Sequence, residues 1–385
     1  MTTFPTTTDV TVETALSEVS PRAAGVLTVD LAAIAENYRR LKSAFLEKAL
    51  AAVVKADGYG LGAERVAPVL VKAGARSIFV AQLDEALELR PLLDRCHPAV
   101  ALYVLNGLMP GAEADYAEHN ILPVLNSLGE IDAWTAFCRA RGTALPAAVH
   151  LDSGMCRLGL PPDEVEVLRG DPERLAGLVP TCILSHLACA DEPGHPMNAE
   201  QLAALKAALT ALPRAPVSFC NSSGIFLGRD YHFDLGRPGV ALYGVNPTPE
   251  APSPVQPVVQ LRAKILQVRQ IDAPQSVGYG ATHRATGPAR IATVAAGYAD
   301  GYLRSISNRG HAWVAGHQVP VVGRVSMDLL ALDVTGVAPD AVRPGLWAEL
   351  LNGEQDVDAL AREAGTIGYE ILTSLGARYH RVYLD

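Results

Sequence analysis

The sequence lacks any run of about 20 consecutive apolar residues, the length that a membrane-spanning helix needs, so we expect no membrane segment. It also lacks long runs of one charge. The formal net charge of -9 is spread over 385 residues, which argues against nucleic acid as a partner. Residues 1–24 include neither the basic segment nor the apolar core of a secretory signal, and we interpret them as a flexible tail.

None of the six cysteines belongs to a C-x-x-C pair, the spacing typical of zinc and redox sites. Several lie inside apolar runs, as buried and reduced thiols do. We therefore expect no metal site, no disulfide framework and a cytoplasmic protein. The cysteines are Cys96, Cys138, Cys156, Cys182, Cys189 and Cys220.

What the chain does contain is a regular order of apolar runs. At 385 residues and 49% hydrophobic composition, two domains are expected. Asp30 can cap a helix whose apolar residues begin at Leu31. Eight runs follow, and all but the last precede a stretch with helical spacing: residues 50–54, 77–81, 100–105, 121–125, 147–151, 181–185, 217–220 and 233–235. Strand alternating with helix in eight units predicts an α/β fold with a (β/α)8 TIM-like barrel over residues 25–246.

The character of the sequence changes after Tyr243. Residues 247–257 are dense in proline and predict a linker. Beyond them, short β-branched runs separated by glycine and proline predict a C-terminal, mostly β domain over residues 247–385, with a helix at residues 368–375. The expected strands of this domain are residues 261–268, 289–294, 311–314, 319–322 and 329–334.

Lys55 stands where the first buried run opens into a glycine-rich loop. A lysine is costly to bury unless it is paired or covalently engaged. In parallel α/β proteins the carboxyl ends of the strands carry the active site, and a desolvated lysine is what a Schiff-base enzyme needs. The alternative interpretation is a lysine whose stem is buried while its ammonium group reaches solvent.

Polar side chains follow four later runs at the same strand end. Together with Lys55, their recurrence predicts one shared site at the C-terminal mouth of the barrel. The turn at residues 237–240 can offer backbone N–H groups to an anion, because barrels often bind phosphate after their seventh and eighth strands. These polar positions and the glycine of the turn are Asp152, Arg157, His186, Asn221, Ser222, Arg237 and Gly239.

Nine segments carry a resemblance to a known family. Each is weakly specific alone, whereas nine in the same order are specific together. From about residue 25 to residue 383 the chain resembles the alanine racemases, which are pyridoxal-phosphate enzymes of fold type III. The segments are VVKADGYGLG, DSGMCRLG, SHLACADE, NSSGI, DLGRPGVALYG, VGYGATH, GYADGYLR, GRVSMD and YEIL.

The resemblance implies a site for pyridoxal 5'-phosphate. Lys55 resembles the lysine that forms the Schiff base with this cofactor. His186 resembles the histidine packed near the pyridine ring, and Arg237 resembles the arginine that hydrogen-bonds the pyridine nitrogen. The residues that resemble the phosphate-binding set are Tyr59, Ser222, Gly239, Val240 and Tyr369.

The resemblance also implies substrate contacts. Arg157 resembles the arginine near the cofactor's phenolic oxygen and the substrate carboxylate, and Met327 resembles the residue whose backbone N–H meets the same carboxylate. Tyr279 resembles the second catalytic base, which the partner subunit supplies in a homodimer with shared active sites. The residues that resemble the substrate entrance are Asp191, Tyr298, Arg304 and Arg324.

The implied activity is the interconversion of L-alanine and D-alanine through a pyridoxal-phosphate aldimine, supplying D-alanine for peptidoglycan. Two acid–base groups suit a reaction that removes the α-proton from one face and returns a proton to the other. Lys55 can serve one face and Tyr279 the other. Arg237 keeps its proton, so the cofactor ring stays a weak electron sink, which restrains side reactions such as transamination.

Two positions depart from the usual pattern of the family. His150 stands where many members have a carbamylated lysine, and imidazole cannot form that carbamate. We expect His150 to orient Arg157 instead, and the alternative is that other groups such as Asp152 hold this arginine. His283 replaces an aromatic hydroxyl.

Rival functions share parts of this pattern. A racemase of broad specificity, or of serine, is the main alternative, and such enzymes usually have asparagine where His150 stands. Amino-acid decarboxylases share the architecture but usually place an acidic residue at the pyridine nitrogen and a cysteine as proton donor, so Arg237 and Tyr279 argue against them. Non-catalytic single-barrel carriers of the cofactor lack the second domain that this sequence predicts.

Overall fold

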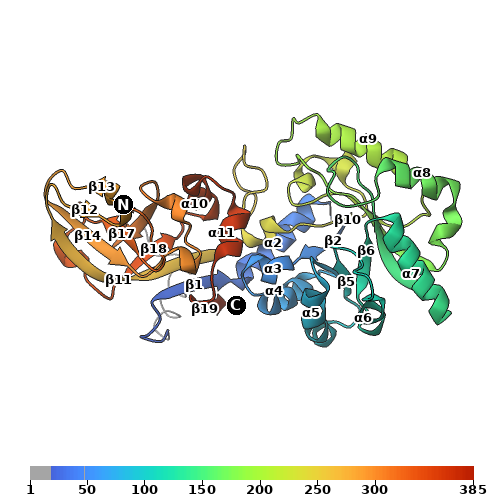
Figure 1. Cartoon of the computed structure of the whole chain (residues 1–385), viewed down its shortest axis with the longest axis horizontal. Coiled ribbons are helices and arrows are strands. Elements are labelled where there is room, and N and C mark those ends of the chain that lie inside the picture. Colours follow the sequence, from blue (N-terminus) through green and yellow to red (C-terminus); the bar gives the residue numbers. More distant parts are fainter. Residues whose placement is uncertain (1–18, 47) are drawn as a thin grey trace. The chain divides into compact units, whose positions relative to one another are not determined.

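The computed structural model describes residues 19–46 and 48–385 (Figure 1). The chain divides into two compact units. We call residues 34–242 and 246–256 the barrel unit. The sheet unit comprises the described residues up to 33, residues 243–245 and residues 257–385. Each unit is built around its own sheet.

The barrel unit consists of short parallel strands with helices between them. Its strands are β2 (Ala49–Leu50), β3 (Ala52–Val53), β4 (Ser77–Val80), β5 (Ala101–Val104), β6 (Leu122–Leu125), β7 (Leu145–His150), β8 (Leu178–Leu184), β9 (Val217–Ser218) and β10 (Leu235–Gly236). Its helices are α2 (Leu31–Ala44), which begins in the sheet unit, α3 (Lys55–Tyr59), α4 (Ala63–Ala73), α5 (Leu83–Cys96), α6 (Glu113–Glu118), α7 (Leu128–Arg141), α8 (Pro162–Gly170) and α9 (Met197–Leu209). Figure 1 shows α5 to α9 on the outside of these strands.

The strands close into a ring in sequence order. Strands β3 to β9 form one parallel sheet in that order, and β10 pairs in parallel with β2. Backbone hydrogen bonds from Arg237 N to Cys220 O (2.9 Å) and from Ala51 N to Gly236 O (2.8 Å) link β9 to β10 and β10 to the first strand. The predicted (β/α)8 barrel is therefore confirmed. The cap on α2 is also present, because Ala33 N donates to Asp30 Oδ1 at 2.7 Å.

The barrel strands are apolar along nearly their whole length because they are buried on both faces. Val54, Ile78, Phe79 and Val124 are each at most 1% exposed. The helices outside them present one apolar face to the sheet, as the buried residues of α4 do. With the inner layer filled by side chains, polar groups collect where the strands end.

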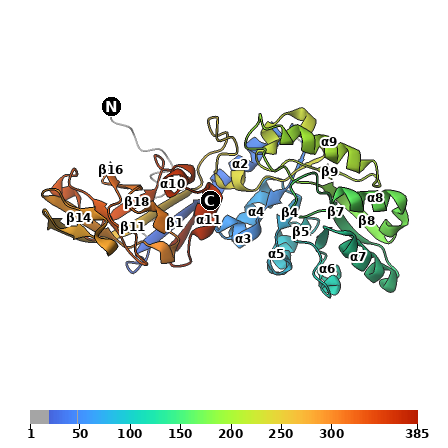
Figure 2. The ribbon, with the colours of Figure 1, turned by 45° about the horizontal axis from the view of Figure 1, so that its top comes forward.

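The sheet unit is mostly β, as predicted. Its strands in the described residues are β1 (Gly25–Asp30), β11 (Val259–Ile271), β12 (Ser276–Val277), β13 (His283–Arg284), β14 (Ala289–Val294), β15 (His311–Val314), β16 (His317–Pro320), β17 (Leu330–Asp333), β18 (Trp347–Leu351) and β19 (His380–Leu384), and its helices are α10 (Val357–Ala364) and α11 (Gly368–Ser374). The long strand β11 pairs antiparallel with β1, β14 and β18 (Figure 2). Strands β12 and β13 form a separate hairpin.

The start of the chain differs from the predicted domain range of residues 25–246. Strand β1 pairs antiparallel with β11 and parallel with β19, so residues 25–33 belong to the sheet unit. An apolar strand followed by a helix has the same local pattern in either fold, and only pairing over more than two hundred residues distinguishes them. Of the predicted tail, residues 1–18 lie outside the described residues. Lys264 Nζ donates to Pro21 O at 2.9 Å, so the end of that range is attached to β11.

Two further expectations can be compared with the structure. Among the helices of residues 19–46 and 48–385, none is both long and apolar enough to cross a membrane. All six cysteines are free. Cys138, Cys182 and Cys220 are buried, whereas Cys96 and Cys156 are exposed, so the expectation of buried thiols is wrong at those two positions.

Candidate active site

Lys55 is the first residue of α3 and directly follows the buried end of the first barrel strand. The backbone then turns in the left-handed sense: φ is 53° at Ala56, 54° at Asp57 and 62° at Gly58. Gly58 N donates to Val54 O at 2.9 Å, which closes the turn. A left-handed conformation costs a residue other than glycine about 1–2 kcal/mol. Such strain persists only where surrounding groups impose it, often at functional sites.

Two carboxylates impose this turn. Glu85 Oε1 accepts a hydrogen bond from Ala56 N at 2.5 Å, while Glu85 Oε2 accepts from Ala81 N at 2.7 Å and Gln82 N at 2.9 Å. Asp57 Oδ1 accepts from Ala63 N at 2.8 Å, at the start of α4. The backbone next to Lys55 is therefore fixed to the ends of two neighbouring elements.

The environment of Lys55 favours the neutral amine. Burial lowers the pKa of Lys55 below its ordinary value, the positive charge of Arg157 lowers it further, and the negative charge of Glu85 opposes both. A neutral amine is the nucleophile that attacks an aldehyde. Lys55 thus has the location and the electrostatics that a covalent cofactor link requires.

A group of hydrogen-bond donors lies at the mouth of the barrel beyond β9 and β10. Ser222 is buried, and its Oγ accepts from Gly239 N at 3.0 Å and from Ala241 N at 3.3 Å. A Cβ atom on Gly239 would overlap the hydroxyl of Tyr59, so only glycine allows this approach. Val240 begins the short helix Val240–Tyr243 within the same turn. Two hydroxyls and a run of backbone N–H groups are chemically suited to a phosphate group.

Arg237 is 4% exposed and lies next to this turn. Its guanidinium donates to Ser218 Oγ, to Ser185 O at 2.6 Å and to His186 Nδ1 at 3.4 Å. Burial lowers the pKa of Arg237, and it lowers the pKa of His186 to well below its ordinary value, with the charge of Arg237 adding to the effect. His186 is therefore neutral, and its Nδ1 can accept from the arginine. A fixed, buried guanidinium suits a ring nitrogen that accepts a hydrogen bond.

Arg157 lies in the loop after β7 and is exposed. The carboxylate of Asp152 accepts from Gly154 N at 2.9 Å and from Cys156 N at 3.1 Å, so it holds the backbone of this loop. His150, the last residue of β7, is 8% exposed, and its Nδ1 lies 2.7 Å from Asn126 Oδ1. Burial, then the charge of Arg237, lowers the pKa of His150 to about 3. The predicted role of His150 toward Arg157 stays a prediction.

The remaining barrel residue of the predicted site is Asp191. It is exposed in the loop between β8 and α9. The other six predicted residues lie in the sheet unit: Tyr279, Tyr298, Arg304, Arg324, Met327 and Tyr369. The structure therefore places the predicted site in two groups, one in each unit.

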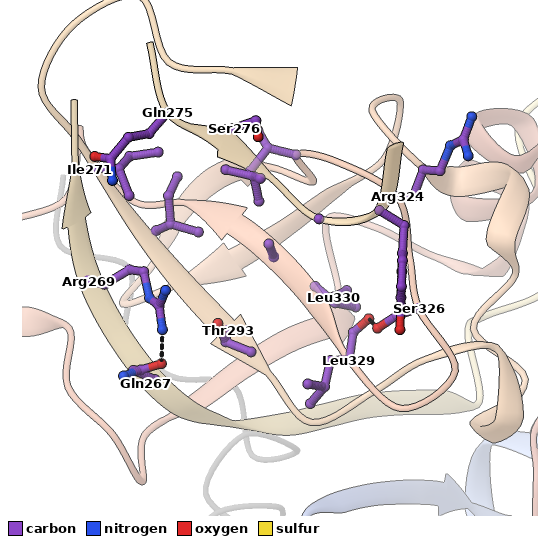
Figure 3. A pocket seen from close by; sticks show the side chains of 16 residues that line it. Gln267, Arg269, Ile271, Gln275, Ser276, Thr293, Arg324, Ser326, Leu329 and Leu330 are labelled. Atoms are coloured by element: carbon purple, nitrogen blue, oxygen red, sulfur yellow. Dashed lines mark hydrogen bonds between the residues drawn. The ribbon is translucent and has the colours of Figure 1, made fainter. Parts of the chain in front are cut away.

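Within the sheet unit, Tyr279 and Arg324 lie on touching loops. Tyr279 is 71% exposed in a short helix, Tyr279–Ala281. A Cβ atom on Gly280 would lie 3.0 Å from a guanidinium nitrogen of Arg324. Both side chains line a hollow of about 630 Å³ on the sheet, which also includes Gln275 and Leu329 (Figure 3).

The other sheet-unit residues lie on neighbouring segments. Tyr298 N donates to Ser326 O at 3.1 Å, which places Tyr298 beside Met327. Arg304 begins another short helix, Arg304–Ile306. Tyr298 and Met327 are 43% and 53% exposed, and Tyr369 on α11 is 41% exposed. Exposure of several large side chains in one unit is typical of a surface that meets another part of an assembly.

Sequence reasoning missed two polar residues of the barrel mouth, Asn126 and Glu85. Asn126 directly follows β6, so the pattern of polar residues at strand ends could have identified it. Glu85 lies in the first turn of α5, where an acidic residue is ordinary. No sequence signal distinguishes Glu85 from a helix-capping carboxylate.

Comparison with known proteins agrees over nearly the whole chain. Residues 29–247 match the alanine racemase N-terminal domain, and residues 258–383 match the alanine racemase C-terminal domain. The alanine racemase of Rhodospirillum rubrum is 52% identical over 364 residues, which are 94% of this chain and 96% of that protein. A protein of Agrobacterium fabrum named alanine racemase, catabolic, is 49% identical over 94% of this chain and 93% of its own length.

Solved structures give the same answer. The alanine racemase of Bartonella henselae, crystallised with covalently bound pyridoxal phosphate, has a TM-score of 0.90 and 42% identity, covering 94% of this chain and 100% of that chain. The alanine racemase of Streptomyces coelicolor has a TM-score of 0.89 and 34% identity, covering 95% of this chain and 99% of that chain.

The barrel, its attached β domain and the lysine at the barrel mouth define a pyridoxal-phosphate enzyme. Both domains match along most of their length. The chain belongs to the alanine racemase family. It is an isomerase, and its cofactor is pyridoxal 5'-phosphate. The Tyr59–Ser222–Gly239 cradle and the buried Arg237 fit the phosphate and the ring nitrogen of this cofactor.

Proposed function

We propose that this enzyme interconverts L-alanine and D-alanine by a two-base mechanism in which Lys55 and Tyr279 are the acid–base groups. The observation that carries the proposal is Lys55 itself. Its amine has a lowered pKa, and Lys55 directly precedes a strained turn in the same barrel unit as the hydrogen-bond donors of Ser222 and Gly239. A lysine without a covalent or catalytic role would gain nothing from this placement.

When bound, the cofactor withdraws electrons from the α-carbon of the amino acid. Lys55 Nζ then takes or returns the α-proton on one face, and the hydroxyl of Tyr279 does so on the other. Arg237 keeps its proton and so limits electron withdrawal by the ring, which favours return of the α-proton over other reactions. We assign Tyr59, Ser222, Gly239, Val240 and Tyr369 to the cofactor phosphate and His186 to the face of its ring.

We assign recognition of the substrate to the exposed side chain of Arg157 and to the backbone N–H of Met327. Arg157 binds the carboxylate of the substrate, and the N–H of Met327 meets the same group. Asp191, Tyr298, Arg304 and Arg324 surround the substrate entrance. Because Tyr279 and Met327 belong to the sheet unit and are exposed, we infer that they complete the site of a second copy in a homodimer.

The biological role we propose is the supply of D-alanine for peptidoglycan. The relatives in Agrobacterium fabrum and Mesorhizobium japonicum are named catabolic, so use of D-alanine as a nutrient is the competing role. The second candidate activity is a racemase of broad specificity or of serine. His150 leaves this alternative open, because the lysine that many members of the family have at this position is absent here.

The covalent assignment can be tested by borohydride reduction followed by peptide mapping. We expect the reduced cofactor on Lys55, because burial and Arg157 lower the pKa of its amine. Racemisation of L-alanine should be lost in Lys55→Ala, and turnover of a panel of L-amino acids then separates the two candidate activities. Cofactor found on Lys72 or Lys206 instead would contradict the assignment, and faster turnover of serine than of alanine would favour the second activity.

A further inference from the structure

The buried amide of Asn126 has one possible orientation. Its Nδ2 donates to Leu105 O at 3.2 Å and to Val124 O at 2.9 Å, which uses both amide hydrogens. Its backbone N donates to Glu130 Oε2 at 2.9 Å, so the residue is also fixed from behind. Two carbonyl acceptors fix the amide nitrogen, and the oxygen must therefore face His150.

This orientation determines the tautomer of His150. Asn126 Oδ1 can only accept, so the ring nitrogen 2.7 Å away, Nδ1, must carry the hydrogen. The ring is neutral, because its burial and the charges of Arg237 and Arg157 outweigh the opposing charge of Asp152. The second nitrogen, Nε2, therefore has a free lone pair. Within the described part of the chain it has no hydrogen-bond partner.

The loop that carries Arg157 is anchored on the same histidine. Leu160 N donates to His150 O at 2.8 Å, and Asp152 N donates to Leu160 O at 2.9 Å, so the loop begins and ends beside β7. A Cβ atom on Gly159 would lie 3.1 Å from His150 Cδ2. Glycine at this position therefore allows the imidazole ring to pack against the loop. The imidazole is thus packed between Asn126 on one side and the Arg157 loop on the other.

The two arginines near His150 differ in whether their guanidinium groups already have hydrogen-bond partners. Arg237 already donates to Ser218 Oγ, Ser185 O and His186 Nδ1. Arg157 has no hydrogen-bond partner among the described residues. A neutral imidazole lone pair attracts a guanidinium and repels a carboxylate.

We propose that Asn126 is a positioning residue: it locks His150 in the Nδ1–H tautomer, and the Nε2 lone pair then orients the guanidinium of Arg157 for the substrate carboxylate. The inference rests on the proposed function, because Arg157 is the residue assigned there to that carboxylate. Charge–charge attraction is not involved, so the arrangement works with an uncharged ring.

A matched pair of substitutions at His150 tests the acceptor. Glutamine can place its side-chain oxygen near the position of Nε2, whereas asparagine reaches only as far as Nδ1. We expect His150→Asn to raise KM for L-alanine about 10- to 100-fold, the loss of one hydrogen bond to a charged group, with kcat changed less. His150→Gln should recover most of that loss. Equal KM values in the two variants would overturn the assignment of Nε2.

The tautomer is read directly by 15N NMR of the holoenzyme labelled at histidine. The signal of His150 is the one absent from His150→Gln. We expect Nδ1 to carry the proton in the wild type and Asn126→Ala to give a mixture of tautomers with a raised KM. The matched control is Asn37→Ala, because Asn37 is an equally buried amide that donates to Gln256 O at 2.9 Å in the same unit.

The outcomes separate this inference from the proposed function. A proton on Nε2 of His150 in the wild type would overturn the inference even if racemisation is fast. A locked Nδ1–H tautomer in a protein that does not racemise alanine would refute the proposed function and keep the tautomer assignment. An equal rise of KM in Asn37→Ala would show that loss of any buried amide has this effect, and would also overturn the inference.

Discussion

The pKa of Lys55 depends on burial and on the charges of two neighbouring side chains. Burial of its amine disfavours the charged form. Arg157 disfavours that form further and Glu85 favours it, so the pKa of Lys55 reflects two opposing charges. Glu85 also holds the backbone of Ala56, so one carboxylate affects both the electrostatics and the geometry of the lysine.

The pH dependence of cofactor capture tests this balance. The neutral amine of Lys55 is the reactive form, so capture by the apoenzyme should rise with pH, with a midpoint below that of an ordinary lysine. Glu85→Gln removes the charge that raises the pKa of Lys55, and the midpoint should move to lower pH still. The measurement is the rate of the absorbance change when pyridoxal phosphate is added to the apoenzyme. The pH is varied from 6 to about 10, so that the range extends close to the ordinary pKa of a lysine side chain.

Glu88→Gln is the matched control for that experiment. Glu88 lies one turn further along α5 and lines the same surface hollow as Glu85, but it does not shift the pKa of Lys55. Its substitution should leave the midpoint unchanged. An unchanged midpoint in Glu85→Gln would mean that the carboxylate acts only through the backbone.

At the same scale, the sequence predicts residues whose chemistry is unusual for their position. Lys55, His186 and Arg237 are of this kind, because a charged or titratable group at the buried end of an apolar strand is costly unless it has a partner or a function. Asn126 and Glu85 are not, since an amide after a strand and an acid in the first turn of a helix are common. Their importance depends on partners that only the folded chain brings near.

In the sheet unit, some connections between secondary-structure elements require glycine at a given position. Gly301 follows a short helix, Tyr298–Asp300, at a φ of 88°, and a Cβ atom there would overlap the carbonyl oxygen of Ser374 at the end of α11. Gly316 turns the β15–β16 hairpin at a φ of 78° with open space around it. The two glycines share a backbone conformation and differ in surroundings.

Substitution by alanine at these two positions distinguishes the cost of a left-handed backbone from the cost of a steric clash between Cβ and a neighbouring segment. Gly316→Ala should cost about 1–2 kcal/mol of unfolding free energy, the penalty of a left-handed alanine. Gly301→Ala should cost about 2–5 kcal/mol, because displacement of the backbone at Ser374 adds to the same penalty. Matched thermal unfolding scans give the comparison, and equal losses at the two sites would show that the segment around Ser374 yields freely.

The elements themselves were largely predictable. The nine barrel strands overlap the eight predicted runs, with β2 and β3 both on the first, because a strand buried on both faces must be apolar throughout. The range predicted for the barrel includes residues 25–33, whereas β1 lies in the sheet unit, because its partners β11 and β19 lie far along the chain. Strands β18 and β19 are not among the predicted strands, because WAELL has no β-branched residue and HRVYL has one, whereas the prediction rests on β-branched runs.

The whole molecule presents its proposed catalytic groups in two units, Lys55 in the barrel unit and Tyr279 in the sheet unit. Tyr279 is 71% exposed, an unusual state for a large aromatic residue that does not meet another surface. A homodimer in which each sheet unit serves the barrel of the other copy would account for both observations.

Mixed dimers test this arrangement. Lys55→Ala and Tyr279→Phe should each nearly abolish racemisation, because each removes one of the two proposed bases. When subunits exchange between the two variants, one of the two sites in a mixed dimer contains both wild-type groups. Partial activity should therefore return, measured as racemisation after mixing relative to each variant alone. Full exchange without recovered activity would place both bases in one chain.

The left-handed turn after Lys55 has a consequence for chirality. Inverting the configuration at Cα reverses the map of allowed backbone angles, so the angles of Ala56, Asp57 and Tyr59 are those that mirror-image amino acids prefer. The backbone beside the proposed catalytic lysine is, in stereochemical terms, an enantiomeric segment built from L-residues. At Ala56, D-alanine would relieve the steric conflict that L-alanine bears. A chain that inverts free alanine thus holds one of its own alanines in the backbone geometry of the opposite hand.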